Sequence, residues 1–238
     1  MARPLVLLLC LAMLLFSACG DDDDDGGDGQ SGGGGDAAAQ TQGEGQAAEK
    51  GQPCREVPMP NPKPDGGAKK PSGKLAPGKT YRAVLKTSCG DITVRLDQKT
   101  SPKTAASFAS LVEQGFYNGT IFHRIVPGFV IQGGDPTSQG SGGPGYSVRD
   151  KPPADTVYSQ GIVAMAKTEV EPPGTSGSQF YIVTAPDAGL PPDYAVLGEV
   201  VKGLDVALAI DQLGDPASGG AGTPLQTVLL EKATLDES

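Results

Sequence analysis

The chain has 238 residues, of which 37% are hydrophobic and 20% are charged, and its formal net charge is -9. This length predicts one ordinary domain plus additional sequence. The acidity argues against nucleic acid as a partner, because phosphate contacts require clustered Lys and Arg. Part of the negative charge comes from residues 21–25, which are all aspartate. We interpret this run as a solvated spacer, since consecutive carboxylates in a flexible chain lack the fixed geometry of a metal site.

The N-terminus has the pattern of a secretion signal. An early cation precedes an apolar run over residues 5–16, which is shorter than the about 20 residues that span a bilayer. The ending FSAC is similar to the bacterial lipobox, although Phe16 stands where Leu is usual. We therefore predict a lipoprotein-type signal peptide over residues 1–18 and lipidation of Cys19, which would anchor the chain to the cell membrane outside the cytoplasm. Plain secretion after a cut at Ala18 is the alternative.

The four cysteines fit an extracytoplasmic location. Cys10 would leave with the signal peptide and Cys19 would be acylated, so that Cys54 and Cys89 remain. In an oxidising compartment such a pair predicts one disulfide, with two free thiols as the alternative. Closing a loop of about 36 residues would stabilise the fold by about 3–4 kcal/mol on the chain-entropy model. The Cys and His spacings of zinc sites are missing, so we expect no metal.

The segment after the signal is poor in apolar side chains. Residues 20–51 consist mostly of Gly, Asp, Gln, Ala and Ser, which cannot bury enough surface to offset the entropy of ordering. Residues 52–79 add seven prolines, which stiffen the chain toward an extended geometry. We predict a disordered tether over residues 19–79. If Cys54 pairs with Cys89, the last part of this tether would lie along the folded domain.

Strand patterns dominate from residue 80 onward. Alternating apolar and polar residues predict a hairpin of residues 81–87 and 91–96, with Gly90 at a positive φ. Ser101 followed by proline predicts the start of a helix that runs to Gly115. Further strands are predicted around residues 120–132, 157–167, 178–184, 196–201 and 225–234, and a second helix over residues 203–213. Many short strands with Gly-rich connections favour a closed antiparallel barrel with helices covering its ends.

Two stretches carry a family resemblance. The run FHRIVPGFVIQGGDP at residues 122–136 and the run GSQFYI at residues 177–182 resemble the cyclophilin family of peptidyl-prolyl cis-trans isomerases. The resemblance covers residues 80–236 and implies a mainly β fold, a closed eight-stranded antiparallel barrel capped by two α-helices. It also implies a substrate groove on the outer face of the barrel, and an enzyme that uses no cofactor.

The reaction of that family needs a hydrogen-bond donor at the proline nitrogen. Amide resonance sets a rotation barrier of about 18–20 kcal/mol. In the twisted state the proline nitrogen can accept a hydrogen bond, so that a donor aimed at it binds the transition state better than the ground state. The resemblance implies that Arg124 is this catalytic donor. One charge-assisted hydrogen bond contributes about 1.5–3 kcal/mol, so the pocket must supply the rest of the acceleration.

The resemblance also assigns the substrate-binding residues. They are Phe129, Val130, Gln132, Ala166, Lys167, Gln179, Tyr181, Leu190 and Tyr194. Phe129, Val130, Tyr181 and Leu190 would line a pocket for the proline ring, and Gln132 would contact the substrate backbone. Ala166 and Lys167 match a strand that pairs with the peptide, where the family more often has Asn at the second position.

Several positions depart from the family pattern or call for a structural interpretation. Gly189 stands where many eukaryotic members carry a tryptophan that packs on cyclosporin, so we expect weak cyclosporin binding. Tyr194 stands where those members have a histidine. His123, the only histidine, is interpreted as a supporting residue, because the reaction needs no proton transfer. Residues 140–143 resemble the Gly-rich rim loop of the family, and they lack the lysine and following helix of a phosphate-binding P-loop.

The leading hypothesis is thus a tethered, monomeric isomerase that assists the folding of secreted or cell-envelope proteins and binds proline-containing polypeptides. A proline-peptide binding module or holdase chaperone with incidental catalysis is the alternative. The presence of Arg124 argues against it, because binding alone would not require this residue. A solute-binding lipoprotein is a third possibility, but such proteins generally need two lobes.

Overall fold

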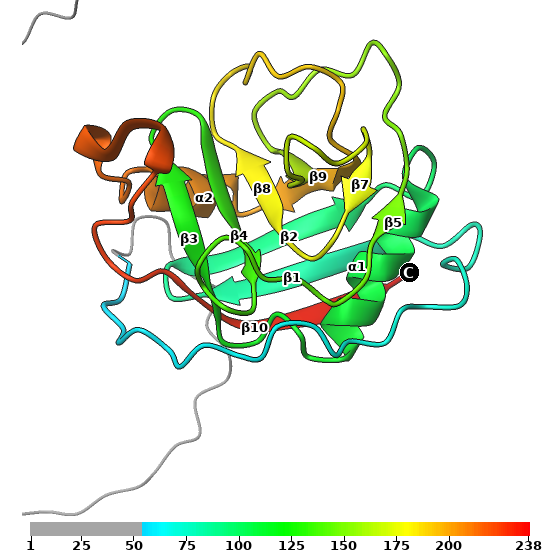
Figure 1. The fold of residues 1–238 in the computed structure, drawn as a ribbon, viewed down its shortest axis with the longest axis horizontal. Helices are drawn as coiled ribbons and strands as arrows, with labels where there is room; N and C mark the ends of the chain where they lie inside the picture. Colours follow the sequence, from blue (N-terminus) through cyan, green and yellow to red (C-terminus); the bar gives the residue numbers. More distant parts are fainter. Residues whose placement is uncertain (1–53) are drawn as a thin grey trace, which may run out of the picture. The chain divides into compact units, whose positions relative to one another are not determined.

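The computed structural model describes residues 54–238. Ten strands, two α-helices and one 3-10 helix organise them (Figure 1). The strands are β1 (Tyr81–Thr87), β2 (Gly90–Leu96), β3 (Thr120–Val126), β4 (Val130–Asp135), β5 (Val148–Arg149), β6 (Ile162–Met165), β7 (Thr175–Ser176), β8 (Phe180–Val183), β9 (Val196–Lys202) and β10 (Leu229–Glu237). The helices are α1 (Pro102–Glu113), α2 (Leu204–Asp211) and the 3-10 helix η1 (Pro216–Ala221).

Eight of the strands close a barrel in the order β1, β10, β3, β4, β8, β6, β9, β2. Every neighbouring pair is antiparallel. The two remaining strands, β5 and β7, form a separate two-stranded sheet. Closure leaves no barrel strand with an unpaired edge. This topology confirms the predicted closed eight-stranded antiparallel barrel.

The predicted hairpin is β1 and β2, whose residues pair in register from Arg82 with Arg95 to Thr87 with Gly90. Gly90 has a φ of 127°, as the sequence predicts, because a residue without Cβ enters this region freely. The hairpin carries the regular alternation of a barrel wall, and Ala83, Leu85 and the other inward residues are fully buried.

The barrel interior is a packed apolar core. Phe180 lies at its centre and makes edge-to-face contacts with the rings of Phe108, Tyr117 and Phe122 at centroid distances of 5.6, 5.9 and 6.0 Å. The Tyr117 hydroxyl donates to the carbonyl of Ser178 at 3.1 Å, so this buried polar group is satisfied. The interior is therefore filled by side chains and has no lumen for a ligand.

The two α-helices lie at opposite ends of the barrel (Figure 1). Helix α1 begins with Pro102 after Ser101, as predicted, but the Ser101 side chain makes no capping hydrogen bond. The carboxylate of Asp150, far along the chain, accepts instead from the Thr104 N–H at 2.7 Å. The sequence thus predicts where α1 begins, while the group that caps it comes from tertiary structure.

Two predicted strands differ from the observed ones. The stretch 120–132 is divided into β3 and β4 by a turn at residues 127–129. The Gly128 N–H in this turn donates to the Asp211 carboxylate of α2 at 2.9 Å, a contact that local sequence patterns do not reveal. The stretch 157–167 contains only the short strand β6. On either side of β6, the Gln160 N–H donates to the Pro186 carbonyl at 3.3 Å and the Ala166 N–H to the Gln179 carbonyl at 2.9 Å. In both stretches, distant groups hold the backbone where the local apolar pattern would continue a strand.

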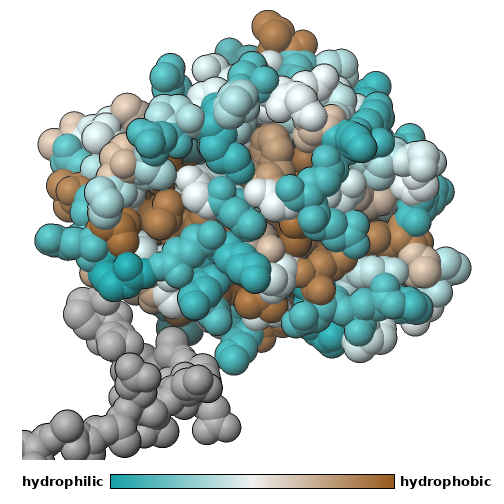
Figure 2. Space-filling model, turned by 90° about the horizontal axis from the view of Figure 1, so that it is seen from below, coloured by the Kyte–Doolittle hydropathy of each residue, from teal (hydrophilic) through white to brown (hydrophobic). Residues whose placement is uncertain are grey.

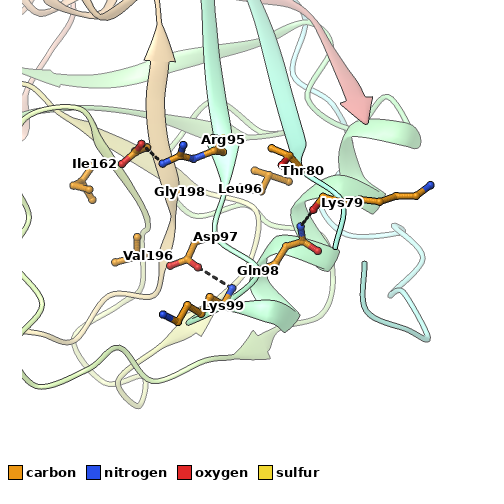
Figure 3. Close-up of a pocket in the computed structure, with 11 residues that line it drawn as sticks. Lys79, Thr80, Arg95, Leu96, Asp97, Gln98, Lys99, Ile162, Val196 and Gly198 are labelled. Atoms are coloured by element: carbon orange, nitrogen blue, oxygen red, sulfur yellow. Dashed lines mark hydrogen bonds and ion pairs between the residues drawn. The ribbon is translucent and has the colours of Figure 1, made fainter. Parts of the chain in front are cut away.

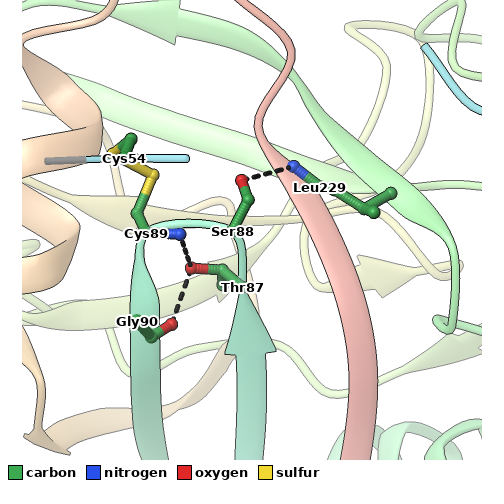
Figure 4. The surroundings of a disulfide bond; sticks show 6 residues. All are labelled: Cys54, Thr87, Ser88, Cys89, Gly90 and Leu229. Carbon is green, nitrogen blue, oxygen red and sulfur yellow. Dashed lines mark hydrogen bonds between the residues drawn. A yellow bond between two sulfur atoms is a disulfide. The ribbon is translucent and has the colours of Figure 1, made fainter. Parts of the chain in front are cut away.

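Residues 54–79, here called the strap, run along the barrel past β10 and α1 (cyan in Figure 1). The predicted tether covered residues 19–79, and its last part differs from a disordered chain because a disulfide joins Cys54 to Cys89 in the turn between β1 and β2 (Figure 4). The Arg55 N–H donates to the Ser88 carbonyl at 2.9 Å beside this bond. The predicted signal peptide, Cys19 and the rest of the tether lie outside the described residues.

The surface of the described part is mainly hydrophilic. Figure 2 shows one face, on which hydrophilic residues separate small apolar groups. The large apolar side chains that are most exposed, such as Met59, Val170 and Leu225, are far apart in the sequence, and single exposed apolar residues are normal for soluble proteins. Within residues 54–238, no helix is long and apolar enough to cross a membrane.

Candidate active site

The candidate site begins at a bulge in β3. Phe122 pairs with Gly133 and Arg124 pairs with Gln132, so that His123 is an extra residue in this strand. Side chains of a regular strand alternate between its faces, and Arg124 would then point inward like Phe122. The bulge shifts the alternation by one residue. As a result His123 and Arg124 both lie outside the core, between the inward side chains of Phe122 and Ile125.

Arg124 occupies one end of a row that crosses the outer face of the barrel. Its register partner on β4 is Gln132, which pairs with Tyr181 on β8. Tyr181 in turn pairs with Ala164 on β6, and Ala164 with Val196 on β9. The row places a cation and an amide directly beside apolar residues, as expected for a site that binds a peptide and holds a ring.

The apolar part of this row belongs to a second cluster, separate from the barrel core. We call it the outer-face cluster. Its buried members are Val130, Tyr158, Ala164, Tyr181, Val183 and Ala185, and its half-buried members are Phe129, Ile162, Ala166, Ala188, Leu190, Tyr194 and Val196. Six residues that were predicted to bind substrate fall within it. Val130 and Tyr181 are almost completely covered, at 2% and 4% exposure, so Phe129, Leu190 and Tyr194 offer more of its accessible surface.

The Arg124 guanidinium is held at two points. Its Nε donates to the Gly220 carbonyl of η1 at 3.1 Å, and its Nη1 donates to Gln132 Oε1 at 3.4 Å. Within residues 54–238, the Nη2 group makes no hydrogen bond to protein. Partial burial lowers the pKa of Arg124, but a guanidinium starts so far above neutrality that it remains charged at pH 7. Arg124 is therefore an oriented cation with donor capacity to spare.

The stem of Arg124 is also packed. Gly222 follows η1 with a φ of 65°, and a Cβ at this position would lie 2.8 Å from Arg124 Cγ. The Gly222 carbonyl accepts from the Ile125 N–H at 2.7 Å. Only glycine fits this backbone against the arginine. The contact was not anticipated from sequence, because residues 216–222 carry no strand or helix pattern.

Gln132 continues the polar side of the site. Its Nε2 donates to Gln179 Oε1 at 3.0 Å, and Gln179 Nε2 donates to the carbonyls of Gly140 and Gly142 at 3.0 and 2.9 Å. The structure thus brings together Arg124, Gln132 and Gln179, which lie on different segments of the sequence. Their hydrogen bonds form one continuous line from β3 to the loop that follows β4.

That loop, residues 136–145, is organised by Asp135. The buried Asp135 carboxylate accepts from the Thr137 N–H at 2.7 Å and from the Gln139 N–H at 3.1 Å, and it also accepts from the Gly140 N–H. Burial by itself would raise the pKa of Asp135, but the hydrogen bonds from Thr137 and the glycines outweigh burial, and the pKa is lowered. The carboxylate therefore stays charged and holds the loop at neutral pH.

The turn that carries Phe129 is held by Asp211, the last residue of α2. Asp211 accepts from the Gly128 N–H and, at 2.6 Å, from the Thr184 hydroxyl. The Phe129 carbonyl accepts from the N–H groups of Thr184 and Ala185 at 3.0 and 3.2 Å. Asp211 was not singled out in the sequence, although a carboxylate on the apolar stripe of a predicted helix is a signal of a buried polar role.

Two tyrosines of the outer-face cluster differ in their hydrogen bonding. Tyr158 donates its hydroxyl to the Tyr194 carbonyl at 2.7 Å and accepts from the Tyr194 N–H at 3.0 Å, which fixes the Tyr194 backbone. The Tyr181 hydroxyl is buried and has no partner among the described residues. Burial raises the pKa of both phenols, that of Tyr158 to about 12. Both hydroxyls are therefore neutral at physiological pH.

Ala166 and Lys167 follow the end of β6. The Ala166 N–H already donates to the Gln179 carbonyl at 2.9 Å, so peptide pairing at this edge would fall to the Ala166 carbonyl and the Lys167 N–H. The Lys167 ammonium lies 5.4 Å from the centre of the Tyr194 ring. Such a cation over an aromatic face orders both side chains at the rim of the cluster.

His123 is half-buried beside Arg124, and both of its ring nitrogens are covered. Neither ring nitrogen has a partner among the described residues, and an added Cβ on Gly140 would lie 3.7 Å from the ring. Burial and, to a smaller extent, the Arg124 charge lower the pKa of His123, against the opposing effect of Asp135. The ring is therefore neutral at pH 7 and lies between Arg124 and the loop after Asp135, a position that suits the predicted supporting role.

A separate hollow of about 380 Å³ lies on the barrel wall beside β2 and β9 (Figure 3). Two of its cations are paired within the protein, since Arg95 forms an ion pair with Glu199 and Lys79 forms one with Glu237. The Asp97 carboxylate accepts from the backbone N–H of Lys99 at 2.9 Å. None of the predicted site residues lines it. Within residues 54–238, no group of His, Cys, Asp and Glu side chains is placed to hold a metal ion.

Comparisons with known proteins give the family. Residues 82–235 match the model of the cyclophilin type peptidyl-prolyl cis-trans isomerase/CLD family. The chain is 37% identical over 155 residues to peptidyl-prolyl cis-trans isomerase-like 1 of Aspergillus oryzae, covering 63% of this chain and 92% of the relative. It is 36% identical over 171 residues to peptidyl-prolyl cis-trans isomerase B of Streptomyces anulatus, covering 65% and 95%.

A solved structure gives the same result. A cyclophilin type peptidyl-prolyl cis-trans isomerase of Cryptosporidium parvum, crystallised in the presence of the dipeptide Ala-Pro, matches with a TM-score of 0.59 and 29% identity, over 65% of this chain and 98% of that one. The family model alone covers more than half of the sequence. The chain therefore belongs to the cyclophilin-type family and is a peptidyl-prolyl cis-trans isomerase.

Proposed function

We propose that this chain isomerises X-Pro bonds of secreted or cell-envelope proteins, with Arg124 as the donor to the proline nitrogen. The observation that carries the proposal is the row on the outer face, where the Arg124 guanidinium and the Gln132 amide lie in register beside Tyr181. The bulge at His123 is what places the cation there. A β-bulge disrupts regular strand pairing and redirects a side chain. The bulge at His123 therefore supports a functional role for the redirected Arg124 side chain.

The proposed chemistry needs no proton transfer. As the X-Pro bond twists, the proline nitrogen gains a lone pair that accepts a hydrogen bond from the guanidinium. The Nε and Nη1 groups of Arg124 are held by Gly220 and Gln132, so the remaining N–H groups are aimed by the protein and lose little freedom on binding. This preorganisation supports Arg124 as an electrostatic catalyst.

Arg124 alone would supply only part of the acceleration. A charge-assisted hydrogen bond contributes about 1.5–3 kcal/mol, equivalent to one or two decades of rate. We assign the rest to the outer-face cluster, where Phe129 and Leu190 would hold the proline ring while the preceding carbonyl swings. Ala-Pro was present in the related Cryptosporidium parvum structure, which supports a proline-containing peptide as the ligand here.

The place of action is inferred from the N-terminal sequence. The apolar run before Cys19 and the Gly- and Asp-rich residues that follow support a lipid-anchored protein whose domain reaches its clients outside the cytoplasm. Replacing Cys19 by Ser should abolish incorporation of labelled palmitate and release the chain from membranes. Palmitate labelling that survives Cys19→Ser would rule out this anchor.

The test of the proposed function is the cis-to-trans rate of an X-Ala-Pro peptide with the full chain in mild detergent. Arg124→Ala should lower kcat/KM about tenfold to a hundredfold without a change in the unfolding midpoint. Arg124→Lys, which keeps the charge but loses the planar fork, should recover little of the loss. A wild-type chain that binds the peptide but does not accelerate its isomerisation would favour the binding-module alternative.

A further inference from the structure

The strap contacts the catalytic domain at the loop beside the site. The family model matches residues 82–235, so the strap, residues 54–79, precedes the part of the chain shared with the family. Its start is tied to the barrel by the Cys54–Cys89 disulfide (Figure 4). Its later residues hydrogen-bond to residues 136–145, which we call the rim loop. The strap is therefore an addition to the family domain that reaches the neighbourhood of the active site.

The central contact is a clamp on Gly143. The Asp65 carboxylate accepts from the Gly143 N–H at 2.8 Å, and the Gly66 N–H donates to the Gly143 carbonyl at 2.9 Å. Both polar atoms of the Gly143 backbone are thus held by neighbouring residues of the strap. An added Cβ on Gly145 would lie 3.1 Å from Gly66 Cα, so the two backbones pack closely here.

Further contacts hold the rim loop on either side of Gly143. The Lys63 N–H donates to the Pro136 carbonyl at 2.8 Å, and the Ala68 N–H donates to the Pro144 carbonyl at 3.1 Å. Four of the six residues from 140 to 145 are glycine, a composition with high conformational freedom. The shape of this loop must therefore be imposed by its contacts, and the strap supplies several of them.

The rim loop in turn determines how Gln179 is oriented. The carbonyls of Gly140 and Gly142 both accept from Gln179 Nε2, at 3.0 and 2.9 Å. A flipped amide would place its oxygen against two acceptors, so the loop fixes one orientation. Gln179 Oε1 then accepts from Gln132 Nε2 at 3.0 Å, which leaves Gln132 Oε1 to accept from Arg124 at 3.4 Å. Each amide can take only the orientation that the previous one allows.

We propose that Asp65 is a positioning residue for the isomerase reaction. Asp135 already holds the loop at Thr137, Gln139 and Gly140. Asp65 adds the hold on Gly143, next to the Gly142 carbonyl that orients Gln179, and through Gln179 and Gln132 it orients the Arg124 guanidinium. Asp65 does not touch the substrate and acts only through these groups. The inference rests on the proposed role of Arg124, and it makes residues 63–68 of the strap part of the structure that positions Arg124.

The first test compares three variants of the full chain. Asp65→Ala removes the acceptor for Gly143 and should lower kcat about three- to tenfold, the effect of one hydrogen bond, with a smaller change in KM. Asp65→Asn keeps an acceptor oxygen at the same position and should restore most of the rate. Glu56→Ala removes an exposed carboxylate of the same strap and should leave the rate unchanged. An Asp65→Asn protein as slow as Asp65→Ala would overturn the proposal.

A spectroscopic measurement separates positioning from general loss of stability. The side-chain amide resonances of Gln132 and Gln179 should move in folded Asp65→Ala and return in Asp65→Asn. A folded Asp65→Ala protein with both amide signals unchanged would contradict the relay, whatever its rate.

The last test asks whether the effect passes through Gln179. In a Gln179→Ala background, Asp65→Ala should have almost no further effect on kcat, because residues that act as one unit are not additive. Additive losses would contradict the proposal. Arg124→Ala is measured in parallel. If it is slow while Asp65→Ala equals the wild type, only the role of the strap fails, whereas a fully active Arg124→Ala protein removes the proposed donor and the relay together.

Discussion

The barrel core and the outer-face cluster are built from the same strands but differ in what surrounds them. Phe180 and Ile182 of β8 belong to the core, while Tyr181 and Val183, which alternate with them, belong to the outer-face cluster. The core is closed and apolar, and the Tyr117 hydroxyl within it is satisfied by the Ser178 carbonyl. The outer-face cluster borders a line of amides, the Arg124 cation and, at its rim, Lys167, and several of its members are half-buried. The inward side chains of these strands therefore stabilise the fold, and the outward side chains form the candidate active site.

This comparison predicts that changes in the core affect stability most. Phe180→Ala removes the ring at the centre of the core and should lower the free energy of unfolding by about 3–5 kcal/mol. Urea denaturation of the full chain measures this loss. The activity per folded molecule should change little at temperatures where the variant stays folded. A loss below 1 kcal/mol would mean that the core is not packed as described.

The disulfide is expected to have a comparable effect. Replacing both Cys54 and Cys89 by Ser frees a loop that the bond closes over a separation of 35 residues. On the chain-entropy model the stability falls by about 3–4 kcal/mol. Reduced and oxidised wild-type protein provide the matched comparison by thermal unfolding. Equal unfolding midpoints with and without reductant would show that the bond does not contribute.

The outer-face cluster should respond in activity rather than in stability. Phe129 is half-buried beside Arg124's strand and should lose about 1–2 kcal/mol of substrate contact in Phe129→Ala, a five- to thirtyfold fall in kcat/KM. Leu225→Ala, at a position that is 64% exposed, is the control and should behave as wild type. An unaltered kcat/KM in Phe129→Ala would show that the outer-face cluster does not form the proline pocket.

Removing the hydroxyl of Tyr181 and that of Tyr158 should change the free energy of unfolding in opposite directions. Tyr181→Phe removes a buried hydroxyl that has no partner in the described part of the chain, and should stabilise the protein by about 1 kcal/mol. Tyr158→Phe leaves the Tyr194 carbonyl and N–H unpaired and should destabilise it by about 1–3 kcal/mol. Denaturant unfolding gives both values. A destabilised Tyr181→Phe protein would indicate a partner for that hydroxyl, such as bound water.

The smallest effect concerns pH. The folded-state pKa of His123 lies below its ordinary value of 6.5 because of burial and the Arg124 charge. The unfolded chain therefore takes up the proton first, and stability falls as the pH drops below about 6.5, levelling off at the folded-state pKa. His123 is the only histidine. In His123→Gln, the free energy of unfolding should therefore depend less on pH between about pH 7.5 and 5.5. If the free energy of unfolding of His123→Gln depended on pH as steeply as that of the wild type, another group would be responsible for the titration.

Sequence patterns predict the parts of this molecule that local chemistry decides. Gly90 in the β1–β2 turn and the start of α1 at Pro102 follow from turn and helix preferences. The many short strands favour a closed antiparallel barrel, and the resemblance supplies its eight-stranded form and the role of Arg124. The bulge at His123 has no local signature, because it is visible only when β3 is paired with β4. The capping of α1 by Asp150 and the clamp of Asp65 on Gly143 are also tertiary contacts, joined over long stretches of sequence.

The most direct test of the outer-face cluster as the isomerase site is a backbone NMR titration of the full chain with an X-Ala-Pro peptide. We expect the amide signals of residues 130–132, 166–167 and 179–181 to shift, and the cis and trans signals of the peptide to exchange in the same sample. Shifts confined to residues 95–99 and 198–199, around the hollow in Figure 3, would contradict this location. Exchange without any shift at the outer-face cluster would contradict it equally.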